Sequence, residues 1–187
     1  MTSHDRRADS SDLPRRIVLM GVAGSGKSTV GEALASQTGT TYRDGDDLHP
    51  EANIAKMSRG EPLTDEDRWP WLTLVGEALA NAETPLTIGC SALKRSYRDH
   101  IRAKARGPVV FVHLAGSRAV IEGRMGARTG HFMPTSLLDS QFATLEPPAA
   151  DEHAVTVDID QPLDTLVAEI IEKLGEPALR ADLTGTR

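Results

Sequence analysis

The chain has 187 residues, a hydrophobic share of 39% and a formal net charge of -6 at pH 7. This length suffices for one compact α/β domain with a real core and is short for two. An acidic chain also lacks the basic surface that nucleic-acid binding uses. The single cysteine, Cys90, excludes an intrachain disulfide and fits a reducing compartment.

Both ends of the chain are polar. Residues 1–14 contain no apolar segment of the secretory-signal type, and residues 176–187 contain no periodic pattern. We therefore expect two disordered tails around a single domain over residues 15–175. Because no run of about 18 apolar residues is present, we expect a cytoplasmic protein that does not enter a membrane.

Short apolar runs alternate with amphipathic segments between these ends, which is typical of a mostly parallel five-stranded sheet with helices on both faces. Pro70 predicts a turn or kink near the start of the second helix. The predicted strands cover residues 15–22, 40–46, 85–92, 108–116 and 153–160, and the predicted helices cover residues 27–39, 65–82, 94–106, 117–128, 135–146 and 162–174.

The segment GVAGSGKS, residues 21–28, matches the pattern G-x-x-x-x-G-K-[ST] between the first strand and the first helix. Glycines let the backbone N–H groups point inward, Lys27 can reach the β- and γ-phosphates, and the Ser28 hydroxyl can ligate Mg²⁺. The alternative is a glycine-rich turn with a chance lysine, but the flanking elements favour a P-loop NTPase fold. The predicted nucleotide-binding residues are Gly21, Val22, Ala23, Gly24, Ser25, Gly26, Lys27, Ser28 and Thr29.

The sequence favours ATP over GTP. It has no N-K-x-D guanine-reading motif, and its D-x-x-G match, Asp182 to Gly185, lies in the expected tail. These absences indicate a small kinase rather than a signalling switch.

Acidic residues follow the second strand, where ligands bind in parallel sheets. The carboxylates of Asp44 and Asp46 can there hold the water ligands of Mg²⁺, or accept a hydrogen bond from a substrate hydroxyl and take its proton. The alternative for both is an acidic turn that caps a helix. Beside a phosphate loop, the catalytic interpretation is favoured.

The next segment, residues 53–71, is predicted to form a small helical flap over the substrate. Arg59 and Arg68 are candidates to hold a substrate carboxylate through two parallel hydrogen bonds. Solvated surface charges are the alternative for both arginines. Trp69 and Trp71 are expected to be packing residues.

The third strand ends in Cys90-Ser91-Ala92-Leu93-Lys94, where a Walker B segment would offer an aspartate. Ser91 and Lys94 are predicted substrate contacts. Arg98 lies one helical turn beyond Lys94 and is expected to face the same side. Cys90 is expected to be a small buried residue rather than a nucleophile.

Two arginines four residues apart, Arg124 and Arg128, end the fourth predicted helix before a glycine-containing loop. Cations on a mobile backbone are what a lid brings to a transferring phosphate, so we predict a lid over about residues 124–135. Compensation of the helix dipole is the alternative for the arginines. His131 is either a lid contact or a surface histidine.

Several segments together resemble thermoresistant gluconokinases. The resemblance runs in order from about Arg16 to Leu174; the P-loop is widespread among proteins, whereas the segments around DGDDLHP and CSALK are more specific. The similar segments are LMGVAGSGKS, DGDDLHPEANIAKMSRGEPLTDEDRWPWL, CSALKRSYRD, ARTGHFM, SQFATLEPP and VDIDQPL. Trp69 departs from the residue that the family often has at this position.

The resemblance implies phosphorylation of D-gluconate on O6 by MgATP, a fold near shikimate and nucleoside monophosphate kinases, and a homodimer. It implies that Asp46 accepts from the attacking hydroxyl and that Asp44 supports Mg²⁺. It further implies that Arg68 holds the carboxylate and that Arg124 and Arg128 act from the lid. The substrate contacts predicted on this basis are Asp46, His49, Arg59, Arg68, Ser91, Lys94, Arg98, His131 and Gln141.

Two other interpretations remain open at this point. A shikimate kinase usually has three consecutive glycines after the third strand, where this chain has Ile88-Gly89-Cys90-Ser91. A nucleotide-binding regulatory module without turnover would hydrolyse ATP slowly and independently of any acceptor.

Overall fold

The computed structural model describes residues 13–127, 135–177 and 179. Its sheet has five strands, all parallel, in the order β2-β3-β1-β4-β5. This arrangement confirms the predicted five-stranded parallel sheet. The strands are β1 (Arg16–Met20), β2 (Thr41–Asp44), β3 (Leu86–Gly89), β4 (Val110–Ala115) and β5 (Ala154–Asp158).

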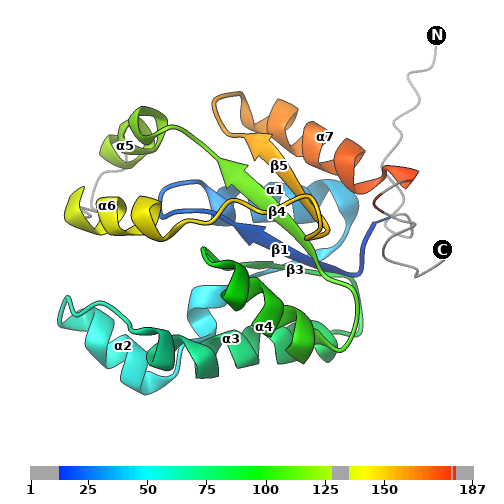
Figure 1. Cartoon of the computed structure of the whole chain (residues 1–187). Helices are drawn as coiled ribbons and strands as arrows, with labels where there is room; N and C mark the ends of the chain where they lie inside the picture. The colour runs from blue at the N-terminus through cyan, green and yellow to red at the C-terminus, as the bar shows by residue number, and fades with distance from the viewer. Residues whose placement is uncertain (1–12, 128–134, 178, 180–187) are drawn as a thin grey trace, which may run out of the picture.

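Helices cover both faces of the sheet, as predicted (Figure 1). Helices α1 and α7 lie on one face and α3 and α4 on the other, while α2, α5 and α6 lie toward the carboxyl ends of the strands. The helices are α1 (Lys27–Thr38), α2 (Glu51–Ser58), α3 (Asp65–Ala80), α4 (Arg95–Ala105), α5 (Arg118–Gly126), α6 (Thr135–Thr144) and α7 (Leu163–Leu174), and a short 3-10 helix, η2 (Gly45–Leu48), follows β2. None of the described helices has the length and apolar character needed to cross a membrane.

Strand β1 lies at the centre of the sheet and divides the core in two. Its side chains alternate, so that Ile17 and Leu19 pack with α1 and α7, whereas Val18 and Met20 pack with α3 and α4. Burial on both faces explains why β1 reads as a continuous apolar run. The strand that leads into the phosphate loop is thereby fixed from both sides.

Helix α3 runs without a break through Pro70, so of the predicted turn or kink near its start the turn is wrong and the kink stays a prediction. The helix begins at a capping box in which the Thr64 side chain accepts from Asp67 N–H and the Asp67 carboxylate accepts from Thr64 N–H. Further along, a Cβ on Gly76 would lie 2.5 Å from Lys104 Cβ, so glycine allows the close approach of α3 and α4. Capping and packing together outweigh the missing N–H of Pro70.

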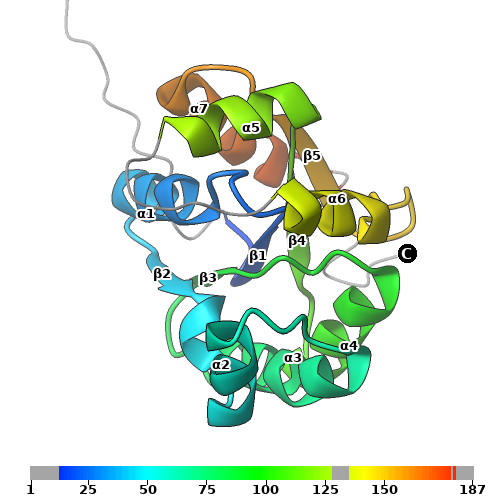
Figure 2. The ribbon, with the colours of Figure 1, turned by 90° about the vertical axis from the view of Figure 1, so that its left-hand side faces the viewer.

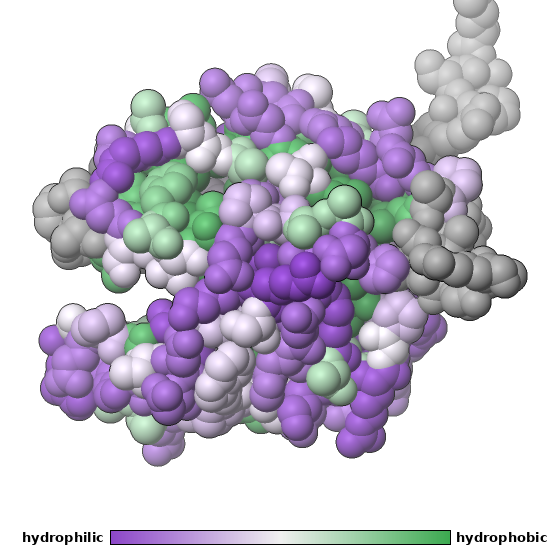
Figure 3. All heavy atoms as spheres, in the orientation of Figure 1, coloured by the Kyte–Doolittle hydropathy of each residue, from purple (hydrophilic) through white to green (hydrophobic). Residues whose placement is uncertain are grey.

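The carboxyl ends of the strands meet at one edge of the sheet, seen face-on in Figure 2, with α2 below, α6 at the right and α5 above. The space-filling view shows the molecule hollowed at this edge, between α2 and the helices α5 and α6 (Figure 3). Ligands of open parallel sheets bind at such an edge. This hollow is called the cleft below.

Candidate active site

The phosphate loop joins β1 to α1 at the cleft. Gly24 and Gly26 have φ values of +81° and +95°, a backbone conformation that side chains rarely adopt. Gly26 is also the N-cap of α1, so the loop leads directly into the N-terminus of that helix, where backbone N–H groups favour an anion. This backbone fits the anion-binding cradle that the sequence predicts.

The Lys27 ammonium lies against this loop, where its Nζ donates to the carbonyl oxygens of Gly21 and Val22 at 3.1 and 3.2 Å. Burial lowers the pKa of Lys27, while the negative charges of Asp46 and Asp44 oppose that effect. Because Lys27 and Asp46 interact electrostatically, the phosphate-loop lysine and the predicted base lie in one site.

Ser28 and Asp44, the two residues predicted to bind magnesium, lie in direct contact. Ser28 Oγ donates to Asp44 Oδ2 at 3.1 Å, across 16 residues of sequence. One hydroxyl and one carboxylate match the few protein ligands that Mg²⁺ takes beside phosphate oxygens and water. No group of three or more histidine, cysteine, aspartate or glutamate side chains that could hold a metal by itself occurs within the described ranges. The donor set therefore fits a metal ion that arrives with a nucleotide.

Asp46 lies in the first turn of η2, which Asp44 caps by accepting from Asp46 N–H at 2.9 Å. The Asp46 side chain is 81% exposed and is therefore open to a ligand. Although the carboxylate is accessible, nearby protein atoms displace part of the water around it and so raise its pKa; repulsion from Asp44 raises the pKa further, and attraction to Lys27 opposes both effects. A carboxylate with a raised pKa is a better proton acceptor.

His49 supports this turn from the interior. Its ring stacks on Trp71 at 4.1 Å between centroids, and Asn53 Nδ2 lies 3.3 Å from its Nδ1. Trp71 Nε1 donates to the Gly45 carbonyl at 2.7 Å, which ties η2 to α3. Burial, followed by the positive charge of Arg68, lowers the pKa of His49 to about 4, so the ring is neutral at pH 7. Trp71 is the packing residue that the sequence predicts.

The lowered pKa of His49 predicts a loss of stability in acid. The unfolded chain takes up a proton at about pH 6.5, whereas the folded protein does so only near pH 4. The free energy of unfolding should therefore fall as the pH drops from 6.5 to 4, by about 3 kcal/mol from this group. Urea unfolding at pH 7 and pH 4.5 should show a smaller loss for His49→Gln than for the wild type. Equal losses would rule out His49 as the source.

Four side chains form a polar group beside the start of α4. Lys94 Nζ donates to both carboxylate oxygens of Asp65, at 3.1 and 2.9 Å, and the Tyr97 hydroxyl donates to the same carboxylate at 2.5 Å. Lys94 and Arg68 lie 5.4 and 5.8 Å from the centre of the Tyr97 ring. Asp65 and Tyr97 were not predicted as site residues. In the sequence Asp65 is explained as a helix cap, and Tyr97 is a single aromatic residue within a predicted helix.

The remaining candidates on this side differ in exposure. Arg68 is half-buried and donates one bond to the Leu63 carbonyl, at 2.5 Å. Arg59 is exposed at the end of α2 and pairs with Glu61 at 2.7 Å. Ser91 meets the phosphate loop through its backbone, since its carbonyl accepts from Gly21 N–H at 3.3 Å.

The prediction that Arg98 contacts the substrate is wrong. Its side chain is 0% exposed, and its guanidinium donates to Glu152, Ala92 and Leu93 inside the protein. Lys94 is the N-cap of α4, with φ and ψ of −95° and 148°, so the helical period does not place these two side chains on one side.

Two predicted residues, Arg124 of α5 and Gln141 of α6, contact the phosphate loop. Arg124 donates to the carbonyls of Ser25, at 3.5 Å, and Ile159. Gln141, from α6, accepts from Ala23 N–H at 2.6 Å, so it contacts the phosphate loop itself. Arg128 and His131 lie outside the described residues, so their predicted lid roles stay predictions.

Cys90 is buried at the end of β3, and burial raises the pKa of its thiol to about 12. A thiol that stays protonated at neutral pH is a poor nucleophile. The expectation of a small buried residue is confirmed.

The parallel sheet, the phosphate loop at its central strand and the acidic residues at the neighbouring strand end define a small P-loop kinase. Residues 17–148 match the family described as AAA domain. Over 159 residues the chain is 49% identical to the thermoresistant gluconokinase of Escherichia coli (strain K12), covering 83% of this chain and 90% of that protein. The chain belongs to the gluconokinase family.

Other relatives agree with this assignment. The gluconokinase of Gluconobacter oxydans (strain 621H) is 45% identical over 174 residues, covering 91% of this chain and 96% of that protein. A crystal structure of a gluconokinase from Sinorhizobium meliloti 1021 superposes with a TM-score of 0.84 at 50% identity, covering 94% and 99% of the two chains. A shikimate kinase from Aquifex aeolicus has a TM-score of 0.57 at 21% identity over 88% and 98%, which shows a shared fold alone.

Proposed function

We propose that the protein transfers the γ-phosphoryl group of ATP to the 6-hydroxyl of D-gluconate, giving 6-phospho-D-gluconate and ADP. The observation that carries the proposal is the juxtaposition of Lys27, the Ser28–Asp44 pair and the accessible Asp46 at one edge of the sheet. The named relatives support the choice of gluconate over other acceptors. A homodimer and a cytoplasmic location belong to the same proposal.

The residues would divide the work between nucleotide and acceptor. The backbone of residues 21–29 and Lys27 would hold the phosphates, and Ser28 with Asp44 would hold Mg²⁺. When bound, Mg²⁺ would neutralise charge on the phosphate oxygens. Arg124 would act beside the phosphate loop, with Arg128 and His131 contributing from the lid.

Asp46 would orient the acceptor hydroxyl and take its proton as the oxygen attacks phosphorus in line with the departing ADP. Its raised pKa suits this role. Neutral His49 would position the turn that carries Asp46 and lie beside the acceptor. Ser91, Lys94, Arg68, Arg59 and Gln141 remain proposed contacts around the cleft.

The decisive experiment is a coupled ADP-release assay with MgATP and a panel of acceptors: D-gluconate, other aldonates, glucose, shikimate and AMP. We expect turnover with gluconate and little with the others. Turnover with another acceptor would keep the kinase and change its substrate. ATP binding without turnover on any acceptor would identify a regulatory module.

Arg68→Ala should raise KM for gluconate by about tenfold or more and change kcat less, because a lost charged hydrogen bond contributes mainly to binding. Arg43→Ala, an exposed arginine on the edge strand β2, is the control and should leave both constants unchanged. An unchanged KM in Arg68→Ala would move the carboxylate site elsewhere, and the same measurement on Arg59→Ala would test the other candidate.

A further inference from the structure

The segment between β3 and α4, residues 91–94, lies between the two halves of the site. On one side, Ser91 O accepts from Gly21 N–H at the start of the phosphate loop, at 3.3 Å. On the other side, Lys94 reaches Asp65 at the start of α3. Its conformation therefore sets the spacing between the nucleotide side and the acceptor side.

The backbone conformation of residues 91–94 needs support from outside the segment. Ala92 has a φ of +43°, in the left-handed region that residues other than glycine avoid. Ala92 is also fully buried, so it has no freedom to relax toward solvent. Such a backbone persists only where the surrounding interactions fix it.

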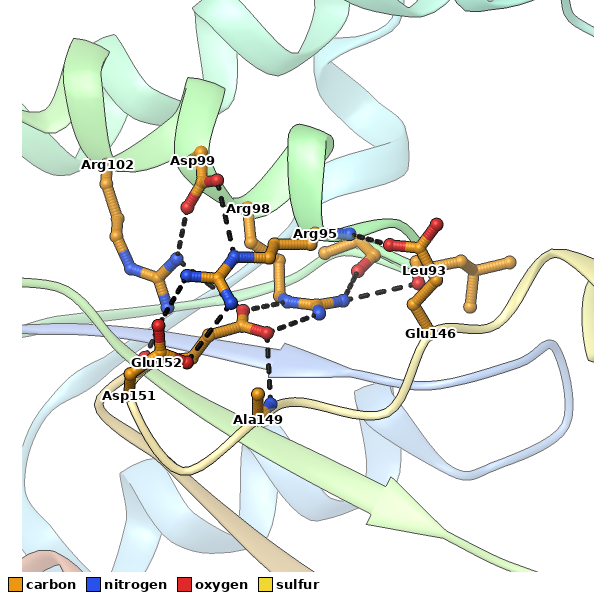
Figure 4. A network of polar contacts seen from close by, with 10 residues as sticks. Leu93, Arg95, Arg98, Asp99, Arg102, Glu146, Ala149, Asp151 and Glu152 are labelled. Atoms are coloured by element: carbon orange, nitrogen blue, oxygen red, sulfur yellow. Dashed lines mark hydrogen bonds and ion pairs between the residues drawn. The ribbon is translucent and has the colours of Figure 1, made fainter.

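Arg98 supplies these interactions from the first turns of α4 (Figure 4). Its Nη1 donates to the carbonyl oxygens of Ala92 and Leu93, at 3.0 and 3.2 Å. Its Nε and Nη2 donate to the two carboxylate oxygens of Glu152, at 2.6 and 2.9 Å. One buried guanidinium thus joins residues 91–94 to the segment before β5.

Glu152 is itself held in place. Its Oε1 accepts from Ala149 N–H at 3.0 Å, and its carbonyl accepts from Arg102. The hydrogen bond from Arg98 lowers the pKa of Glu152 to about 2, so the carboxylate keeps its charge at neutral pH. The segment that carries it also supports Leu93, whose carbonyl accepts from Glu146 N–H at 2.8 Å.

We propose that Arg98 is a positioning residue: anchored by Glu152, it holds residues 91–94 in the conformation that presents Ser91 and Lys94 to the site. Stability alone does not explain the pair, because apolar residues of similar volume often replace a buried ion pair without loss of stability. An apolar pair would fill the space but would donate nothing to the Ala92 and Leu93 carbonyls.

The test is the double variant Arg98→Met with Glu152→Leu, which removes both charges and leaves neither one buried alone. Using gluconate as acceptor, and so resting on the proposed function, kcat/KM should fall by about ten- to a hundredfold, since small displacements at a reacting centre have effects of that size. The KM for ATP should change less, by about twofold at most, because Arg98 donates to the carbonyls of Ala92 and Leu93 and not to residues 21–29. Amide hydrogen exchange in residues 91–94 should become at least about tenfold faster.

The matched control is Arg95→Met with Asp151→Leu. This pair joins the same helix to the same segment, with Arg95 Nη2 2.7 Å from Asp151 Oδ2, but both side chains are exposed. Kinetics and exchange should equal those of the wild type.

Wild-type exchange and wild-type kinetics in the folded double variant would overturn the proposal, even if its melting temperature fell. If the double variant does not fold, Arg98→Lys decides: it keeps the charge opposite Glu152 but lacks the fork that also reaches the two carbonyls. Wild-type constants and exchange in that variant would refute the proposal. Because exchange needs no substrate, a failure of gluconate as acceptor remains distinguishable from a failure of this inference.

Discussion

The variant Asp46→Asn should bind ATP as the wild type does and lose turnover by roughly a hundred- to ten-thousand-fold, the range that general-base catalysis contributes. Asparagine keeps the size of the side chain but cannot take the proton of the attacking hydroxyl. The side chain is largely exposed, and the hydrogen bond to the Asp44 carboxylate comes from its backbone N–H, so the fold should persist. Steady-state kcat with gluconate and the affinity for an ATP analogue together measure the effect.

The adjacent residue provides the control for this variant. Asp47 lies on the same 3-10 turn, is exposed, and carries the same charge. Asp47→Asn should change kcat by less than about twofold, because surface charges outside a reaction centre contribute little. Near-wild-type turnover in Asp46→Asn would exclude Asp46 as the base.

The second large effect is expected for Lys27→Met. Methionine keeps much of the chain length and removes the charge that would meet the phosphates, so kcat/KM for ATP should fall by roughly a hundred- to a thousandfold. Because the Lys27 ammonium is partly desolvated, its removal should not lower stability. Lower turnover with an unchanged or higher melting temperature would separate a catalytic effect from a folding defect.

Lys173→Met is the matched control for Lys27→Met. Lys173 is on α7 and pairs with Glu169 at 2.9 Å, far along the sequence from every residue assigned to the site. The same substitution there should leave the kinetics unchanged. If Lys27→Met also retained its kcat/KM, the phosphate loop would need another cation.

The fold could be predicted because its signals are local. An apolar run such as residues 16–20, followed by a glycine-rich loop and an amphipathic helix, identifies a strand, a turn and a helix without knowledge of the rest. The wrong prediction of a turn at Pro70 has a physical cause. A local sequence pattern treats proline as a helix breaker, whereas the capping box at Thr64 and the burial of Trp71 and Leu72 stabilise the helix as a whole.

The site was less predictable because its pairs are distant in sequence. Arg98 and Glu152 are 54 residues apart, and neither has a local pattern that announces the other. Helical spacing placed Arg98 beside Lys94, but that rule holds only inside a helix, and Lys94 lies before its first turn. Gln141 was identified within a similar segment, yet only the fold shows that it contacts Ala23.

Because all strands of the sheet are parallel, their carboxyl ends lie at one end of the molecule and their amino ends at the other. Among the described residues, those proposed for catalysis lie at the carboxyl ends of the strands, and the turns at the other end of the sheet contain none of them. The turn over residues 81–85, between α3 and β3, is one of these, and Asn81, Glu83 and Thr84 are exposed on it. A fluorophore or an affinity tag inserted there would label the protein at the end of the sheet opposite the described residues proposed for catalysis.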